Sequence, residues 1–267
     1  MTRQLNIRLA ENQVYDIGAG QSWPLGTRAY APDGRVFRYA KNSAIALTIG
    51  KLVRRPEKTL GHQNLAVAAA AALDATSFTV TLTFASTTFD EYEGGLVYVN
   101  DVTGQGYLYG ITGNSLTNQE GTLTVTINVP LKIALTTSSQ ISLIKNRYNG
   151  ARVTETTPNE RTLGSCVVAV PANNYFWAQV AGPAVILQDG EWDENKDLVP
   201  STNLRGSAMA ASAINQIAEA RVGDASYADR LFQGNVIPST AVTNTIGYAL
   251  DPRADTEYGL VQLSLDV

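Results

Sequence analysis

The 267-residue chain contains one cysteine, Cys166, and one histidine, His62. A single cysteine excludes an internal disulfide framework and any multi-cysteine zinc site. Cys166 lies in the alternating apolar stretch SCVVAV, which is typical of a buried small hydrophobic residue rather than a nucleophile. His62 follows a glycine in a linker-like stretch, without the local motifs of a histidine-based triad, and is expected to be a solvated histidine.

Charge and long apolar runs are also scarce. Charged residues make up 16% of the chain, against about a quarter in an average protein, and Thr, Ser, Asn, Gln and Gly take their place. No run of about 18 apolar residues occurs, so no membrane span is expected, and the mixed start MTRQLNIRLAENQ does not resemble a signal peptide. With 44% hydrophobic residues, we expect a soluble β-rich protein with a substantial core, made in the cytoplasm.

No sequence motif indicates a cofactor or a catalytic centre. The GAG at residues 18–20 reads as a turn, because no helical pattern follows it, and no phosphate-binding loop is present. Two acidic clusters, FDEYEGG (89–95) and DGEWDENKD (189–197), contain carboxylates of the kind that serve glycosidases or bind calcium. The second cluster lacks the calcium-loop spacing and includes Lys196. Solvated turn charges are the simpler interpretation, so we expect no catalytic, cofactor or metal site.

The pattern of short alternating segments predicts a mainly β fold with little helix. SFTVTLTF, GGLVYVND, GQGYLYGIT, GTLTVTINV and SQISLIKN read as strands separated by turns. We expect short antiparallel strands forming barrel-like or sandwich-like domains, with an extended N-terminal region. Three regions differ in character: a basic region at 1–60, a central β domain at 61–147 and a C-terminal β domain at 148–267.

Local signals add detail to this outline. APDG at 31–34 predicts a hairpin between TRAYA and RVFRYA. The alanine run at 66–75 has helical propensity but no amphipathic stripe, so it is interpreted as an extended or irregular lead-in. Ile214, Ile217, Ala218 and Arg221 have helical spacing, which indicates either one short helix or an inserted loop within Ile214 to Phe232.

The stretch YFWAQVAGPAVILQDG at 175–190 predicts a strand with two distinct faces. With a period of two, Phe176 and the residues that follow it at alternate positions form an apolar face suited to a core. Tyr175 and Trp177 point the other way, toward a partner or a second sheet. Pro183 removes one ladder donor, which indicates an edge position or a bulge.

Charge is distributed unevenly along the chain. Residues 1–60 contain ten Lys or Arg and four acids, whereas the remaining residues contain ten basic and twenty acidic residues. One interpretation is that the arginines pair with acids of the protein's own body. The other is that residues 1–60 bind an acidic partner surface, for which the planar guanidinium of Arg is well suited. Nucleic acid is not expected, because the whole chain is acidic and no groove-reading motif occurs.

Four segments together resemble head-associated structural proteins of tailed bacteriophages. They are PLGTRAYAPDGRVFRYAKN, GGLVYVNDVTGQGYLYGITGN, PLKIALTTSSQISLIKNRYNG and NYFWAQVAGPAVIL. The resemblance is to decoration or cement proteins and covers most of the chain. It implies a β-rich fold, often a homotrimer, bound to the major capsid protein on the exterior of the virion. It implies no catalytic residues.

On this basis residues 1–60 are expected to be a capsid-binding foot, and their deletion to leave a soluble body that no longer binds capsids. The aromatic candidates include Trp192, which lies in an acidic loop and is expected to be exposed to another chain. Two alternatives remain open: a tail, baseplate or fibre-base component, and a carbohydrate-binding or carbohydrate-active protein that uses the acidic clusters and Trp192. The expected interface residues are Arg28, Arg35, Arg38, Arg54, Arg55, Trp23, Tyr175, Trp177 and Trp192.

Overall fold

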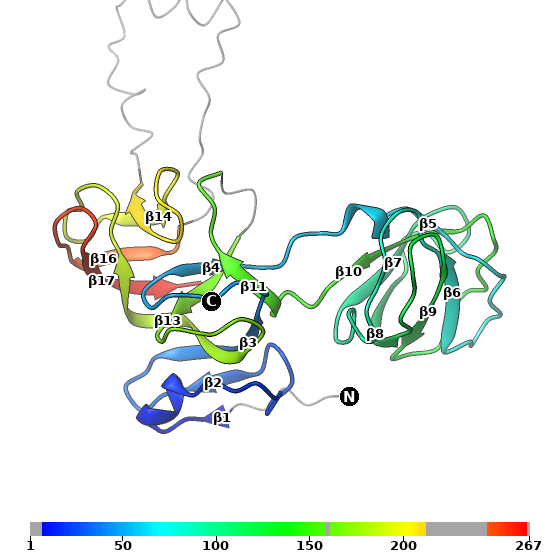
Figure 1. The fold of residues 1–267 in the computed structure, drawn as a ribbon, viewed down its shortest axis with the longest axis horizontal. Helices are drawn as coiled ribbons and strands as arrows, with labels where there is room; N and C mark the ends of the chain where they lie inside the picture. Colours follow the sequence, from blue (N-terminus) through cyan, green and yellow to red (C-terminus); the bar gives the residue numbers. More distant parts are fainter. Residues whose placement is uncertain (1–6, 158–160, 212–244, 266–267) are drawn as a thin grey trace, which may run out of the picture.

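A computed structural model describes residues 7–157, 161–211 and 245–265. The protein is mainly β, with one sheet of eleven strands and one of six, which confirms the predicted fold class (Figure 1). In the described part of the chain, the helical elements are two short 3-10 turns. The stretch Ile214 to Phe232, expected to be a helix or an inserted loop, lies outside the described residues.

The strands divide between two parts of the molecule. The eleven-stranded part, called the body, contains β1 (Ile7–Arg8), η1 (Glu11–Tyr15), β2 (Arg28–Tyr30), β3 (Val36–Asn42), β4 (Leu52–Arg54), β11 (Asn149–Val153), β12 (Thr162–Cys166), β13 (Tyr175–Leu187), β14 (Asp197–Pro200), β15 (Ala208–Ala210), β16 (Gly247–Asp251) and β17 (Tyr258–Ser264). The six-stranded part contains β5 (Leu65–Ala66), β6 (Ser77–Thr81), β7 (Leu96–Asp101), β8 (Leu108–Asn114), β9 (Thr122–Ile127) and β10 (Gln140–Ile144), preceded by η2 (Leu60–His62).

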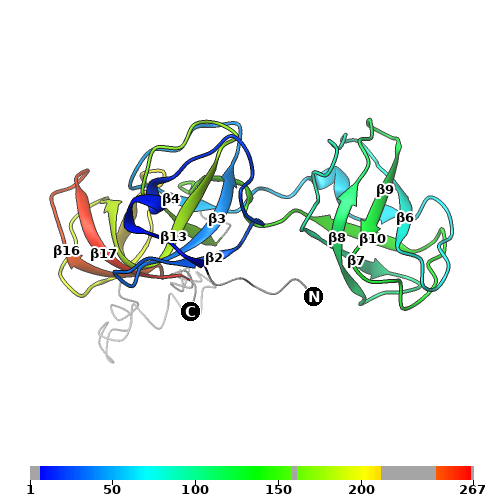
Figure 2. The same ribbon diagram turned by 90° about the horizontal axis from the view of Figure 1, so that it is seen from below.

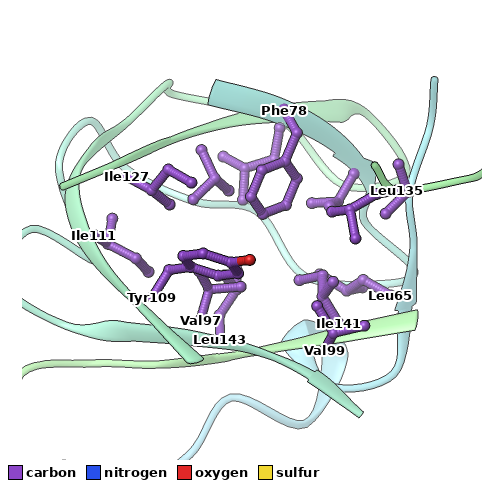
Figure 3. Close-up of a cluster of buried hydrophobic side chains, with 14 of the residues drawn as sticks. Leu65, Phe78, Val97, Val99, Tyr109, Ile111, Ile127, Leu135, Ile141 and Leu143 are labelled. Carbon is purple, nitrogen blue, oxygen red and sulfur yellow. The ribbon is translucent and has the colours of Figure 1, made fainter. Parts of the chain in front are cut away.

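The six-stranded part is a closed barrel, called the inserted barrel. Its strand order is β5-β10-β7-β8-β9-β6, and a bridge between Val67 and Val80 joins the two edges. Strands β6 and β9 alternate Ser or Thr outside with Phe, Val, Leu or Ile inside, as the period-two pattern predicts. The inward side chains fill the barrel with one apolar core (Figure 3).

The body is built from two smaller barrels that share β13. The first barrel contains β3, β11, β4, β12 and the first half of β13, and the pairing of β3 with β13 closes it. The second barrel contains the second half of β13, then β17, β16, β14 and β15, and a bridge from Gln188 to Ala208 closes it. Each barrel has its own apolar core.

Strand β13 changes partners at its middle. Its register with β3 shifts between Gln179 and Ala181, and Gly182 follows with φ +89. Pro183 comes next and pairs with Gln262 of β17 in regular register, so the bulge lies just before this proline, between Gln179 and Ala181, rather than at it. Phe176 points into the core of the first barrel, as the alternation predicts.

An N-terminal layer covers the outside of the first barrel. It consists of β1, η1 and β2 (Figure 1), and β2 pairs with β3 in the hairpin that APDG predicts. Beneath it lies a separate small core that includes Val14, Phe37 and Trp177. The chain itself therefore covers the outer face of β13 over its first half.

The structure corrects the expected separation of residues 1–60 from 148–267. Strands β3 and β4 are inner strands of the first barrel, bonded to β11, β12 and β13. The N-terminal region is therefore half of the body's framework and not an extended foot. Residues 61–145 form the inserted barrel, which lies beside the body and is joined to it by two chain segments (Figure 2). The alanine run is irregular, one of the two forms expected, with isolated bridges at Val67 and Ala71.

Candidate interaction surfaces

Trp177 and Tyr175 both point away from the core of the first barrel, as the alternation predicts, but the chain's own N-terminal layer covers them. Trp177 is 3% exposed, and its ring lies 4.9 Å from that of Tyr39 at a tilted angle. Tyr175 is half-buried and stacks on Tyr39 at 5.8 Å. The prediction of a partner contact for Trp177 is wrong, because the N-terminal layer covers that face of β13.

Trp192 is also buried, which corrects its expected exposure in an acidic loop. It is 5% exposed and belongs to the core of the second barrel, where its ring packs against Gly259. The loop after β13 is held over β17, since the amide of Gln188 donates to Arg253 O and the Gly190 N–H donates to Asp255 Oδ1. Because this loop folds back over β17, the indole of Trp192 lies inside the second barrel.

Two of the five predicted interface arginines are buried in the first barrel. Arg38 donates to Gly26 O at 2.9 Å, and Arg54 pairs with Glu57 at 2.7 Å and with Glu155 at 3.3 Å. The bond from Arg54 is the main reason that the pKa of Glu57 lies below its usual value. Arg38 and Arg54 are therefore structural, because they lie on the inner strands β3 and β4, and their expected direct contact with a partner is wrong.

The other three arginines retain surface at the body. Arg35 is bonded to Asp33 at 2.5 Å and lies over the ring of Phe37. Arg28 lies over the Tyr30 ring at 5.2 Å and has further interactions within the structure. Arg55 lines a recess of about 370 Å³ together with other residues around the first barrel, among them Arg147 and Arg161.

Large apolar side chains stand at the surface of the N-terminal layer. Tyr15 is 50% exposed, Ile17 43% and Trp23 37%. Trp and Tyr are among the residue types enriched in protein–protein interfaces. We call Tyr15, Ile17 and Trp23 the N-terminal patch. Tyr15 and Ile17 were missed in the sequence, because a single apolar residue in a polar loop carries no periodic signal.

The uneven distribution of charge follows the division between the inserted barrel and the rest of the chain. The inserted barrel, residues 61–145, contains two basic residues, Lys132 and Lys145, and six acids. The rest of the chain contains eighteen basic and eighteen acidic residues, which balance. The excess negative charge therefore belongs to the inserted barrel, and the basic excess of residues 1–60 is balanced in number by acids in the rest of the chain.

The two acidic clusters lie in different barrels. Asp90, Glu91 and Glu93 lie between β6 and β7 of the inserted barrel, whereas residues 189–197 follow β13 in the body. They do not meet to form one carboxylate pair. Across the described residues, no group of three or more His, Cys, Asp or Glu is arranged to hold a metal ion.

His62 is buried, which corrects the expected solvated histidine. Its Nδ1 lies 2.5 Å from Tyr92 Oη, and its Nε2 lies 3.3 Å from Ala85 O. A neutral ring fits both contacts, with Tyr92 donating to Nδ1 and Nε2–H donating to the carbonyl. Burial lowers the pKa of His62 and raises that of Tyr92. Cys166 is buried as expected, and burial raises the pKa of its thiol.

A polar cleft lies where the body and the inserted barrel meet. Its volume is about 390 Å³, and its lining includes Lys41, Asn149 and Asn173 from the body and Phe89 and Asp90 from the inserted barrel. Phe89 is 72% exposed there. The cleft combines amides, charges of both signs and one aromatic ring, a set that suits a polar ligand or a polar protein loop.

The second barrel has an apolar outer wall that sequence reasoning missed. On strands β13, β16 and β17 the outward positions include the apolar or aromatic residues Pro183, Val185, Tyr248, Tyr258 and Leu260, together with Gln262 and with Asp251, which pairs with Leu260. A usable signal was present, because AVIL and YGLVQL place apolar residues where a solvated strand has polar ones.

Comparison with known proteins finds no family model, curated protein or solved structure that matches this chain. Within the described ranges, no helix has the length and apolar character needed to cross a membrane.

Proposed function

We propose that this protein is a structural virion protein that binds the outer face of a tailed-phage capsid and stabilises the shell. Its partners are the major capsid protein and further copies of itself. The proposal takes its class from the resemblance of four sequence segments to decoration and cement proteins. The first and last of these segments supply β2, β3 and all of β13, the frame of the body.

The observation that carries the proposal is the N-terminal patch. Tyr15, Ile17 and Trp23 expose apolar surface, although a solvated loop gains nothing from exposed aromatic rings. Exposed aromatic and apolar side chains are typical of the centre of a protein-binding surface. The capsid contact therefore rests on this surface rather than on the whole of residues 1–60.

The alternative of a tail, baseplate or fibre-base component uses the same kind of surface and differs in copy number. Quantitative mass spectrometry of purified particles should find hundreds of copies per virion for a decoration protein and few for a tail component. Absence of the chain from particles would contradict both assignments.

The patch is tested by binding purified protein to capsids that lack it. Trp23→Ala combined with Ile17→Ala should weaken attachment at least about tenfold, since interface hot spots contribute more than about 1 kcal/mol each. Thr79→Ala combined with Thr124→Ala, on the Thr-rich wall of the inserted barrel, is the matched control. Attachment should also weaken with salt. Undiminished binding by the patch variant would place the contact elsewhere.

A further inference from the structure

Three arginines line the recess beside the first barrel. Its volume is about 370 Å³, within the range of about 300–1,000 Å³ that small-molecule sites occupy. The described residues that line it include Arg55, Arg147 and Arg161, and none of them is an Asp or a Glu. The polar cleft between the body and the inserted barrel, by contrast, is lined by charges of both signs. The described lining of the recess is therefore positively charged.

The strand topology brings the three arginines together. Arg55 directly follows β4, Arg161 directly precedes β12, and Arg147 lies two residues before β11. Strand β4 lies beside β11 (Figure 1) and pairs with β12 on its other side, antiparallel to both, so its end meets their starts. Since Thr162 pairs with Arg54, the next residue of each strand leaves the sheet at the same point. The sheet therefore fixes where the backbones of the three arginines lie.

The acids near these strand ends are engaged by other arginines. Glu57 pairs with Arg54 and Arg152, and Glu155 pairs with Arg54 and Arg205. Two carboxylates thus serve three arginines outside the recess, so this end of the sheet has more cations than anions among the described residues. Like charges held close together repel each other, and a bound anion offsets that repulsion.

Arg147 and Arg161 are the arginines of the recess that are most accessible to a ligand. Both are exposed, whereas Arg55 is half-buried and has further interactions within the structure. The guanidinium carbon of Arg147 lies 4.7 Å from the centre of the Tyr148 ring, and its Nη2 donates to Tyr148 Oη. Tyr148 is itself buried in the core of the first barrel, so this contact holds the cation in place.

We propose that this recess binds a small molecule that bears phosphate or carboxylate groups. Guanidinium groups bind these oxyanions through paired hydrogen bonds, and more than one guanidinium suits a ligand with more than one negative charge. Leu163, Val180 and Leu265 give the recess an apolar part for the carbon skeleton of such a ligand. The proposal does not depend on the proposed capsid contact.

Isothermal titration calorimetry of the full-length protein with pyrophosphate and with citrate tests the proposal and distinguishes phosphate from carboxylate. At low salt, where screening is weak, at least one of the two should bind saturably at one site per chain. Arg147→Gln and Arg161→Gln should each raise the dissociation constant at least about tenfold, since each removes charge-assisted hydrogen bonds to the anion. Arg253→Gln is the matched control and should bind as the wild type does, because Arg253 is an exposed arginine paired with Asp251 outside the recess.

The absence of saturable binding by the wild type overturns the proposal, and so does an equal loss of affinity in the Arg253→Gln control. A recess filled by the chain's own carboxylates is the competing explanation. Glu160 and Asp266 adjoin Arg161 and Leu265 in the sequence and lie outside the described residues. If Glu160→Gln or Asp266→Asn binds either anion and the wild type does not, the recess is an internal ion-pair site and the proposal is wrong.

Discussion

At the residue scale, His62 shows how one side chain connects the linker to the inserted barrel. It belongs to η2, immediately before β5, and its ring is enclosed by Tyr92 and Ala85. Nearby, Glu91 is bonded to Lys145 at 2.6 Å. A charged imidazole would lose the bond in which Tyr92 donates to Nδ1 and would carry its charge into a buried site.

The protein should therefore become less stable as the pH is lowered through the range where histidine titrates. The pKa of His62 is lowered in the folded state, so the unfolded chain takes up a proton first as the pH falls below about 6.5. The free energy of unfolding should decrease from there down to the folded-state pKa of His62. Denaturant titrations at several pH values measure this, and His62→Gln should be less stable at pH 7 and lose that part of the pH dependence. An unchanged slope in the variant would contradict the assignment.

Substitutions of Trp177 and Trp23 distinguish a buried structural residue from a surface residue by their effect on the free energy of unfolding. Trp177→Ala should lower the free energy of unfolding by about 3–5 kcal/mol, since it removes a buried ring from the core beneath the N-terminal layer. Trp23→Ala should change it by less than about 0.5 kcal/mol, since that ring is partly exposed. Thermal and chemical denaturation of both variants measure the difference. Equal losses would show that the N-terminal layer does not cover β13 as described.

At the element scale, β13 determines the architecture of the body. It is the only described strand that belongs to both body barrels, and it passes from one to the other where its pairing with β3 ends and its pairing with β17 begins. Gly182 lies at this point, and a Cβ there would be 3.0 Å from the Cα of Arg35. The left-handed backbone and the close approach both call for glycine.

Gly182→Ala should therefore destabilise the body more than an equivalent change in an open turn. Gly34→Ala is the comparison, because Gly34 has a similar φ of +86 but nothing within 4 Å of its added Cβ. Gly34→Ala should cost about 1 kcal/mol of backbone strain, and Gly182→Ala that amount plus the cost of displacing Arg35. Urea titrations compare the two variants. A smaller loss for Gly182→Ala would contradict the close packing of β3 against β13.

At the scale of the whole molecule, the inserted barrel interrupts the sequence of the body but not its sheet. Its entry strand β5 and exit strand β10 pair through Leu65 and Ile141, so the chain leaves beside the point where it entered. It has its own closed sheet and its own core. The body, by contrast, is assembled from both sides of the insertion.

The two parts should respond oppositely to truncation. Residues 59–146 alone should fold and unfold cooperatively, as followed by circular dichroism and amide exchange. Deleting residues 1–60 should unfold the body, because β3 and β4 are inner strands of the first barrel. This reverses the expectation from sequence that the truncated chain is a soluble body. A folded product of that deletion would contradict the barrel topology.

Local sequence determined several strands and turns of this protein. Alternation of Thr with Val and Leu defined β6 and β9, and APDG defined the hairpin, because each signal depends only on backbone sterics and side-chain period. Whether Trp177, Trp192, Arg38, Arg54 and His62 are buried or exposed was decided by tertiary structure. Their environment is set by strands and loops distant in sequence: the N-terminal layer covers β13, and β3 and β4 close a barrel with strands more than a hundred residues away. Period-two patterns report which residues share a face, but only the fold determines what covers that face.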